Sequence, residues 1–131
     1  QIPDNFGAPS HRAIFALAQS ARWRGKLAHL VRATPVAAPA DYFRWLAPVV
    51  QSLDVWTTEY LQVLPARPDG EHPVAAWTRG TWLVPYMAAL AADEQHEFLA
   101  AYAQVLDSAY PPLPDGRTLF PFRRLFIVAN R

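Results

Sequence analysis

Cysteine is absent from the chain, which excludes disulfide bonds, thiolate catalysis and cysteine-based metal sites. The histidines His29, His72 and His96 show no metal-binding spacing, so no metal site is expected. The chain has 11 acidic and 12 basic residues, which gives a net charge of +1. A nucleic-acid-binding protein usually carries a strongly basic stripe, and this charge balance argues against one. No run reaches the roughly 18 apolar residues of a membrane span. We therefore expect no nucleic-acid or membrane partner, and a cytoplasmic location.

Glycine is also scarce. The five glycines are Gly7, Gly25, Gly70, Gly80 and Gly116. Nucleotide-like cofactors are often held by a glycine-rich turn that joins a strand to a helix. No two of these glycines are close enough to build such a turn, so we expect the chain alone to bind no cofactor of this kind.

Hydrophobic residues make up 52% of the 131 residues, enough for the core of one domain. Their periodicity predicts helices over 10–31, 39–48, 73–77, 83–90 and 93–109, with Ser10 and Asp93 as N-caps. β-Branched and aromatic residues predict strands over 54–64 and 118–128. Proline marks the connections, including a Pro/Ala loop over 34–39. The predicted fold class is α/β, mostly helical, and its two strands can pair antiparallel with helices inserted between them.

The last helix and the last strand carry the clearest burial patterns. One stripe of the helix is predicted to face the core, and it consists of Phe98, Leu99, Tyr102, Val105, Leu106 and Ala109. The run Leu125–Val128 is apolar on both faces, as expected for a strand that is covered on both sides. Arg123 and Arg124 precede this run, and strand alternation places their side chains on opposite faces.

Several motifs along the chain together resemble one family. They are Gln1-Ile-Pro-Asp-Asn5, Pro9-Ser-His11, Val55-Trp56, Trp77-Thr-Arg-Gly-Thr81, Asp115-Gly-Arg117 and Leu119-Phe-Pro-Phe-Arg-Arg-Leu-Phe-Ile-Val-Ala129. They resemble the closing part of the trans-aconitate 2-methyltransferase family, which belongs to the class I methyltransferases that use S-adenosylmethionine. The resemblance covers nearly the whole chain, and the last motif is the most specific.

The resemblance implies that the cofactor and the acceptor are bound by different halves of the fold. In class I methyltransferases the first half of the fold binds the cofactor, and the second half, with its inserted helices and a final antiparallel strand pair, shapes the acceptor pocket. Residues 1–131 are therefore expected to form a single C-terminal acceptor-binding or cap portion, without the N-terminal cofactor-binding part. The parent protein would use S-adenosylmethionine to methylate a carboxylate of trans-aconitate or a similar small polycarboxylic acid. The chain alone would be inactive.

Methyl transfer to a carboxylate needs in-line positioning and exclusion of water rather than a catalytic dyad, because the acceptor oxygen is already anionic. We therefore expect no catalytic residue, only groups that hold carboxylates, with arginine as the best bidentate partner. The predicted substrate-binding residues are Asn5, His11, Arg79, Gly80, Thr81, Tyr86 and Arg124. Each also has a structural interpretation, as a surface arginine, a helix-end residue or part of the core.

The chain departs from the family pattern at Trp82 and Val84, where the family usually has glycine and arginine. The resemblance implies that loss of the arginine weakens recognition of a polycarboxylate and that the bulkier Trp82 narrows the pocket.

Two alternatives remain open at the level of the sequence. The chain can be a stand-alone helical module that binds a small anion, or that serves an interaction, without catalysis. It can also form a homodimer through exposed strand edges at Ile2 and at Leu125–Val128, because an unpaired apolar edge invites pairing with another copy.

Overall fold

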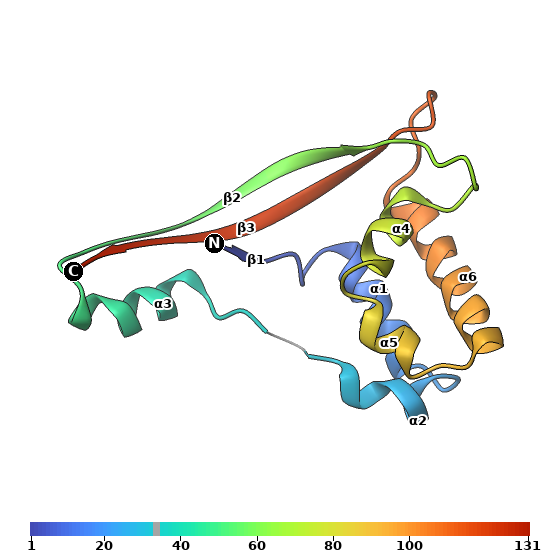
Figure 1. The fold of residues 1–131 in the computed structure, drawn as a ribbon, viewed down its shortest axis with the longest axis horizontal. Coiled ribbons are helices and arrows are strands. Elements are labelled where there is room, and N and C mark those ends of the chain that lie inside the picture. The colour runs from blue at the N-terminus through green and yellow to red at the C-terminus, as the bar shows by residue number, and fades with distance from the viewer. Residues whose placement is uncertain (33–34) are drawn as a thin grey trace. The chain divides into compact units, whose positions relative to one another are not determined.

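The computed structural model describes residues 1–32 and 35–131 (Figure 1). The strands are β1 (Ile2–Pro3), β2 (Ser52–Leu64) and β3 (Thr118–Asn130). The helices are α1 (Pro9–Gln19), α2 (Arg24–Leu27), α3 (Pro39–Leu46), α4 (Pro73–Arg79), α5 (Val84–Ala88) and α6 (Ala92–Ala109), with 3-10 turns η1 (Ala28–Leu30) and η2 (Ala47–Val49). The predicted α/β class is confirmed. The predicted loop over 34–39 lies partly outside the described residues, because Thr34 is not among them.

The described residues form two compact units. The sheet unit contains those of 1–6, 33–62 and 121–131, and the helical unit contains those of 7–32 and 63–120. Strands β2 and β3 run through both units. Within residues 1–32 and 35–131, no helix combines the length and the apolarity that a membrane span requires.

In the sheet unit, β3 is the middle strand of the order β1-β3-β2. β1 pairs antiparallel with it, Ile2 opposite Leu125. The start of β2 meets the end of β3, since the Gln51 N–H donates to the Asn130 carbonyl oxygen at 2.8 Å. This antiparallel arrangement of β2 and β3 is the predicted one. Beyond Leu125, β3 has no β1 residue beside it, and a dimer through such an edge stays a prediction.

Burial along the end of β3 differs from the prediction. Leu125 is fully buried, Phe126 and Ile127 are half-buried, and Val128 is 47% exposed. The expectation that the whole run is covered on both sides was therefore wrong for Val128. An apolar run shows which side chains favour burial, but it does not provide the layer that covers them.

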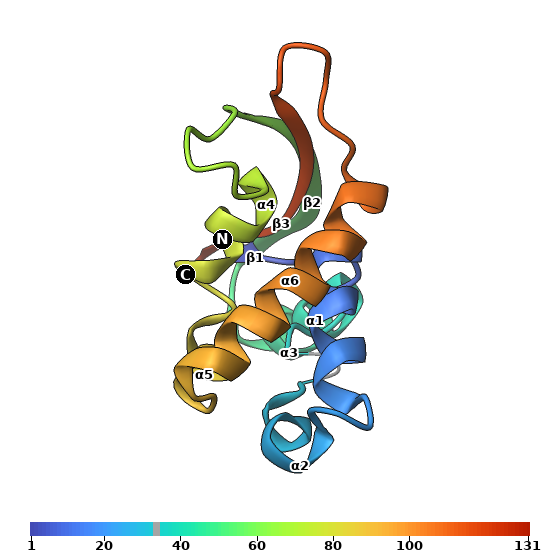
Figure 2. The same ribbon diagram turned by 90° about the vertical axis from the view of Figure 1, so that its right-hand side faces the viewer.

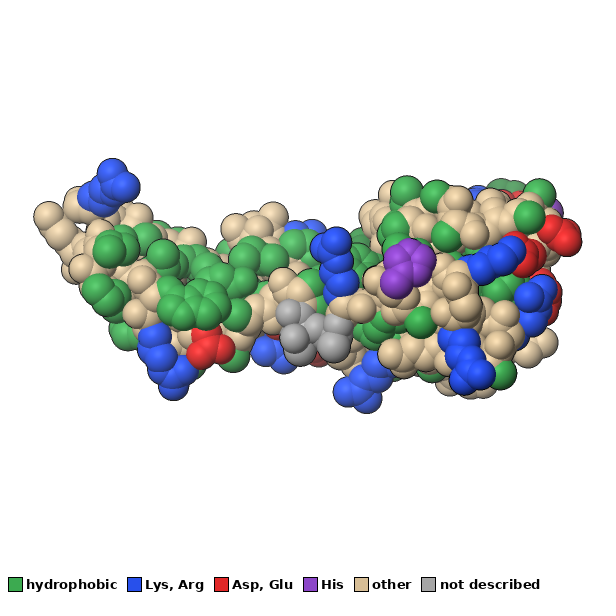
Figure 3. All heavy atoms as spheres, turned by 90° about the horizontal axis from the view of Figure 1, so that it is seen from below, with side chains coloured by type: hydrophobic (Ala, Val, Ile, Leu, Met, Phe, Trp, Pro, Cys, Tyr) green, Lys and Arg blue, Asp and Glu red, His purple; other side chains and the backbone are tan. Residues whose placement is uncertain are grey.

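Helix α3 carries an uncovered apolar surface in the sheet unit. Pro39 starts the helix, as predicted, and Arg44 pairs with Asp41 one turn away at 2.8 Å. None of its residues is fully buried, and Phe43 and Trp45 are 49% and 61% exposed. Figure 3 shows hydrophobic side chains gathered over this helix.

The core of the helical unit lies between α1 and α6, which run side by side in Figures 1 and 2. Phe98, Tyr102 and Leu106 recur every four residues on α6 and are fully buried, as predicted. Trp23 packs edge-on against Phe98, with ring centroids 5.7 Å apart. Val105 is 41% exposed, and Ala109 is also exposed, so the predicted stripe was too wide.

The predicted helix boundaries need three corrections. Ser10 is not an N-cap: Ala8 precedes α1, Pro9 is its first residue, and the Ser10 N–H donates to the Tyr110 hydroxyl at 3.1 Å. Asp93 is not an N-cap either, because Ala91 holds the position before α6. The Ala91 N–H donates to the Glu94 carboxylate at 3.0 Å. The predicted helix 10–31 is interrupted after α1, because Ser20 is extended, with ψ at 159°.

Candidate functional site

A pocket with a volume of about 350 Å³ lies within the helical unit. It is lined by His29, Leu30, Arg32, Thr81, Trp82, Pro85 and Tyr86. One side is therefore η1 and the residues that follow it, and the other is α5 with the turn before it. In Figure 1, α2 and the turn that follows it lie below α5. We call this the Arg32 pocket.

Tyr86 holds the two sides of the Arg32 pocket together. Its side chain is 1% exposed, and its hydroxyl donates to the Leu30 carbonyl oxygen at 3.2 Å. Burial raises the pKa of Tyr86, and the nearby Arg32 charge lowers it by less. The hydroxyl therefore stays protonated at neutral pH and continues to donate. Tyr86, one of the predicted site residues, therefore lines the pocket, and its hydroxyl proton is used in the hydrogen bond to the Leu30 backbone.

Thr81 also lines the pocket, but its hydrogen-bond donors are already bonded to backbone carbonyl oxygens. Its N–H donates to the Thr78 carbonyl oxygen at 3.1 Å, and its hydroxyl to the Trp77 carbonyl oxygen at 3.2 Å. What Thr81 offers a ligand is thus the lone pairs of its hydroxyl oxygen. Gly80, the other residue of this predicted pair, ends α4 in the right-handed region, with φ at −77°, and is not among the lining residues.

Arg32 is the permanent charge of the pocket. It is exposed, and no acidic side chain forms an ion pair with it in the part of the chain that the structure describes. Other cations of the helical unit are neutralised by neighbours: Lys26 by Glu94 at 2.7 Å, Arg22 by Glu97 at 2.8 Å and Arg117 by Asp115 at 2.7 Å. Arg32 therefore remains available to an anion from solution.

His11 supports the pocket from behind one of its walls. It is 4% exposed at the start of α1, with Nδ1 3.3 Å from the Ser10 hydroxyl, and its ring lies 5.4 Å from that of Trp82. Burial lowers the pKa of His11 to about 4, so the imidazole is neutral at pH 7. It does not line the Arg32 pocket and carries no charge with which to attract a carboxylate.

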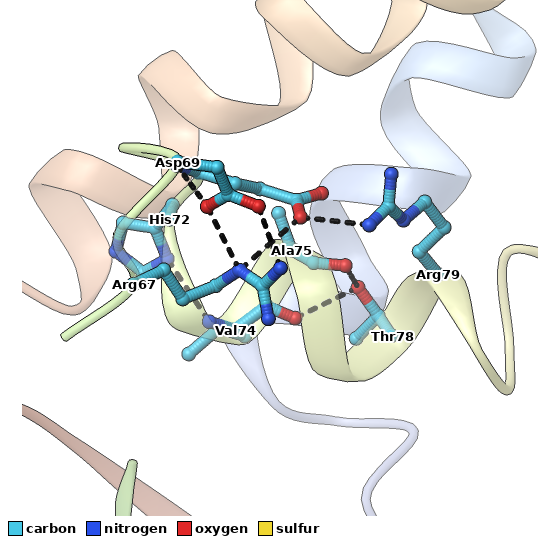
Figure 4. A network of polar contacts seen from close by, with 8 residues as sticks. Arg67, Asp69, His72, Val74, Ala75, Thr78 and Arg79 are labelled. Carbon is cyan, nitrogen blue, oxygen red and sulfur yellow. Dashed lines mark hydrogen bonds and ion pairs between the residues drawn. The ribbon is translucent and has the colours of Figure 1, made fainter. Parts of the chain in front are cut away.

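Arg79, one of the predicted carboxylate-binding residues, belongs to a separate polar network (Figure 4). Its guanidinium donates to the Glu71 carboxylate at 2.9 Å, and Arg67 approaches the same carboxylate at 3.5 Å. Arg67 also pairs with Asp69 at 2.6 Å. Figure 4 shows the Arg79 side chain directed towards this cluster, so an acceptor would have to compete with Glu71.

The remaining predicted residues, Asn5 and Arg124, lie in the sheet unit. Asn5 is 5% exposed and accepts the Arg123 N–H at its side-chain oxygen, 3.1 Å away, while its buried amide nitrogen has no hydrogen-bond partner among the described residues. Arg124 donates to the Tyr60 hydroxyl at 3.0 Å and to the Gln1 side chain. Arg123 pairs instead with Asp4 at 3.2 Å, so the two arginines have different partners.

The structure thus brings Thr81 and Tyr86 to one pocket, with His11 behind Trp82, and leaves Arg79 in its own network. Sequence reasoning missed Arg32 and His29. One signal was present, because residues 5–40 contain no aspartate or glutamate while they carry several arginines. The described residues contain no group of three histidine or acidic side chains that could bind a metal ion.

Curated proteins match the chain from end to end. It is 44% identical over 131 residues to the trans-aconitate 2-methyltransferase of Azoarcus sp. (strain BH72), a match that covers all of this chain and 49% of the relative. The chain is homologous to the trans-aconitate 2-methyltransferases along its whole length. The Streptomyces avermitilis member is 43% identical over 132 residues (100% of this chain, 47% of the relative), and the Rhodococcus jostii member 45% (99% and 50%).

The resemblance predicted from the sequence motifs is therefore confirmed. The chain spans about half the length of these trans-aconitate 2-methyltransferases. No protein-family model matches it.

Proposed function

We propose that the chain is the acceptor-binding C-terminal portion of an S-adenosylmethionine-dependent O-methyltransferase. The acceptor is a carboxylate of trans-aconitate or of a similar small polycarboxylic acid. The observation that carries this proposal is the similarity over the whole chain to proteins named trans-aconitate 2-methyltransferase.

The residues of this chain do not fit S-adenosylmethionine itself. Such a cofactor requires a glycine-rich turn between a strand and a helix. The turn between β1 and α1 contains only Gly7, and that between β2 and α4 only Gly70. Cofactor binding is therefore assigned to the part of the relatives that this chain does not span.

The chain's own contribution is to bind and orient the acceptor. A carboxylate is already a nucleophile at neutral pH, so no general base is required. Arg32 can hold one carboxylate in a bidentate geometry, which fixes the direction in which the free oxygen of another carboxylate points. The apolar walls formed by Trp82, Pro85 and Leu30 keep water away from the bound acid. The neutral His11 behind Trp82 takes no proton at pH 7.

The test is methyl transfer from labelled S-adenosylmethionine to trans-aconitate, cis-aconitate, isocitrate and citrate. It compares this chain with the chain extended by the coding sequence upstream of Gln1 in its gene. We expect the extended protein to methylate at least one acid and the 131-residue chain to be silent. An upstream sequence without a glycine-rich cofactor turn, or an extended protein inactive on all four acids, would refute the proposal.

The Arg32 pocket also favours a second candidate, a module that binds a small anion without catalysis. This candidate requires no upstream cofactor turn. It predicts carboxylate binding by the 131-residue chain in calorimetry, together with no transfer by any extended form. The combination of the two measurements separates the candidates, because only the methyltransferase predicts transferred label.

A further inference from the structure

Two side chains that can carry positive charge stand on the same side of the Arg32 pocket. His29 lies in the 3-10 turn η1, and Arg32 follows two residues after that turn ends. Both residues line the pocket, and both are exposed. Among the residues that line it in the described part of the chain, none is acidic. The charge of the pocket therefore favours anions, with two groups available to receive them.

Backbone contacts hold the segment that carries these two residues. The Val31 N–H donates to the Ala28 carbonyl oxygen at 3.2 Å and closes the turn. The Leu30 carbonyl oxygen, which lies between the two residues in the sequence, accepts the buried Tyr86 hydroxyl at 3.2 Å. Because this backbone is already fixed, a ligand has to order only the two exposed side chains, and the loss of conformational entropy on binding is small.

The charges around His29 bear on when its ring is protonated. Helices α1, α2 and α5 contact η1. Besides Arg32, the titratable or charged side chains on these helices are His11 and Arg12 on α1, Arg24 and Lys26 on α2, and Tyr86 on α5. Lys26 is neutralised by Glu94 at 2.7 Å, and burial keeps His11 and Tyr86 uncharged at pH 7. A histidine side chain changes its charge between pH 5 and 8, and a carboxylate beside it favours the charged form.

From these observations we propose that Arg32 and His29 together bind two carboxylates of one acid, and that binding takes up a proton from solvent at His29. Arg32 is charged throughout the neutral range and holds one carboxylate, and the protonated ring of His29 holds another. In a tricarboxylic acid such as trans-aconitate, the third carboxylate then remains free for methyl transfer. The inference rests on the proposed function in treating this ligand as the acceptor, and it adds His29 and a pH dependence to that function.

Calorimetric titration of the 131-residue chain tests the number of carboxylates that are bound. Fumarate and crotonate share an unsaturated four-carbon skeleton, with two carboxylates in fumarate and one in crotonate. We expect fumarate to bind about threefold more tightly than crotonate at pH 6, or better, which is the modest gain of one exposed ion pair. Equal affinities, or no binding of fumarate, overturn the proposal.

The same titration at pH 6 and pH 8 tests the role of His29. Both carboxylates of fumarate stay ionised over this range, so a change in affinity reports on the protein. Fumarate should bind about threefold or more tightly at pH 6 than at pH 8. At pH 7 the heat of binding should also depend on the ionisation heat of the buffer, because a proton is taken up. An affinity that is the same at both pH values refutes the proposal.

Variants then locate the two contacts. His29→Gln should abolish the pH dependence, and His29→Lys, which keeps its charge, should bind tightly at both pH values. Arg32→Gln should weaken fumarate binding about fivefold or more at either pH. The matched control is His96→Gln, an exposed histidine of α6 outside the pocket lining, which should behave like the parent chain.

Circular dichroism first shows that each variant is folded, which is expected because the substituted side chains are exposed. A folded His29→Gln variant that keeps the full pH dependence refutes the proposal. The two proposals also fail separately. Methyl transfer to trans-aconitate by the extended protein, without His29-dependent fumarate binding, removes only this inference. Fumarate binding that depends on His29 and Arg32, without transfer by the extended protein, removes only the proposed function.

Discussion

The Tyr86 hydroxyl donates a hydrogen bond to the Leu30 carbonyl oxygen, 3.2 Å away, and so joins α5 to a turn that lies 56 residues earlier in the chain. Removal of the hydroxyl in Tyr86→Phe should lower the free energy of unfolding by about 1 kcal/mol. Urea denaturation measures this loss. The control is Tyr42→Phe, whose hydroxyl makes no hydrogen bond in the described part of the chain. Equal effects of both substitutions would show that the Tyr86 hydrogen bond stabilises nothing.

Burial of His11 makes stability depend on pH. Its pKa is about 4 in the folded chain, against 6.5 for a histidine that is fully exposed to water. Between these values the unfolded chain binds more protons than the folded one, so the free energy of unfolding falls as the pH drops from 6.5 towards 4. One such group contributes at most roughly 3 kcal/mol over this window, at 1.36 kcal/mol for each pKa unit.

The variant His11→Gln should flatten this part of the stability profile, since glutamine does not titrate. Urea denaturation at half-unit intervals from pH 4 to pH 7 gives the slope. The exposed His96 on α6 provides the comparison, through His96→Gln. An unchanged slope in His11→Gln would place the pH dependence elsewhere.

Gly116 approaches Ala66 where β2 ends and β3 begins. Its φ is +81°, and a Cβ atom added to it would lie 2.9 Å from the Ala66 Cβ. Gly116→Ala should therefore destabilise the chain by about 2 kcal/mol or more, from left-handed strain plus the clash. Gly70→Ala, with φ at +74° and open space around it, isolates the strain alone. Thermal unfolding should rank Gly116→Ala below Gly70→Ala, and the opposite order would contradict the close approach of Gly116 to Ala66.

Arg124 lowers the pKa of Tyr60, chiefly through the hydrogen bond to the Tyr60 hydroxyl. Arg124→Gln should raise that pKa, which carbon NMR of the labelled tyrosine ring can follow as the pH is increased. Arg123→Gln is the matched control, because Arg123 pairs with Asp4 and not with Tyr60. A Tyr60 pKa that responds equally to both variants would exclude a specific contact with Arg124.

Local sequence patterns predicted the core residues of α6 and the position of β2. Spacing alone identified Phe98, Tyr102 and Leu106 as core, because a helix repeats its faces whatever lies around it. It also placed β2 to within two residues at its start. The break at Ser20 was missed, since the apolar positions on both sides of it keep helical spacing. Periodicity does not register a change in direction of the chain.

The candidate site was less predictable, because its members meet through long-range contacts. Arg32 becomes a pocket residue only when Tyr86 fixes the η1 segment beside α5. Arg79 matched the motif of the family, yet its partner Glu71 lies eight residues earlier, on the turn before α4. A motif identifies which side chains can bind a carboxylate, and the fold decides which of them are already occupied by one.

His72 has both ring nitrogens engaged: Nδ1 accepts the Val74 N–H at 3.2 Å, and Nε2 lies 3.1 Å from the Tyr110 carbonyl oxygen, to which it must donate. Tyr110 in turn accepts the Ser10 N–H at its hydroxyl. The His72 ring thus joins the start of α4 to the end of α6, and the Tyr110 hydroxyl joins the end of α6 to the first turn of α1. These three places are distant in sequence, and loss of the imidazole would remove the contacts to α4 and to the end of α6 but not the one between Tyr110 and Ser10. Parts of three helices of the helical unit therefore meet at one small cluster of polar contacts.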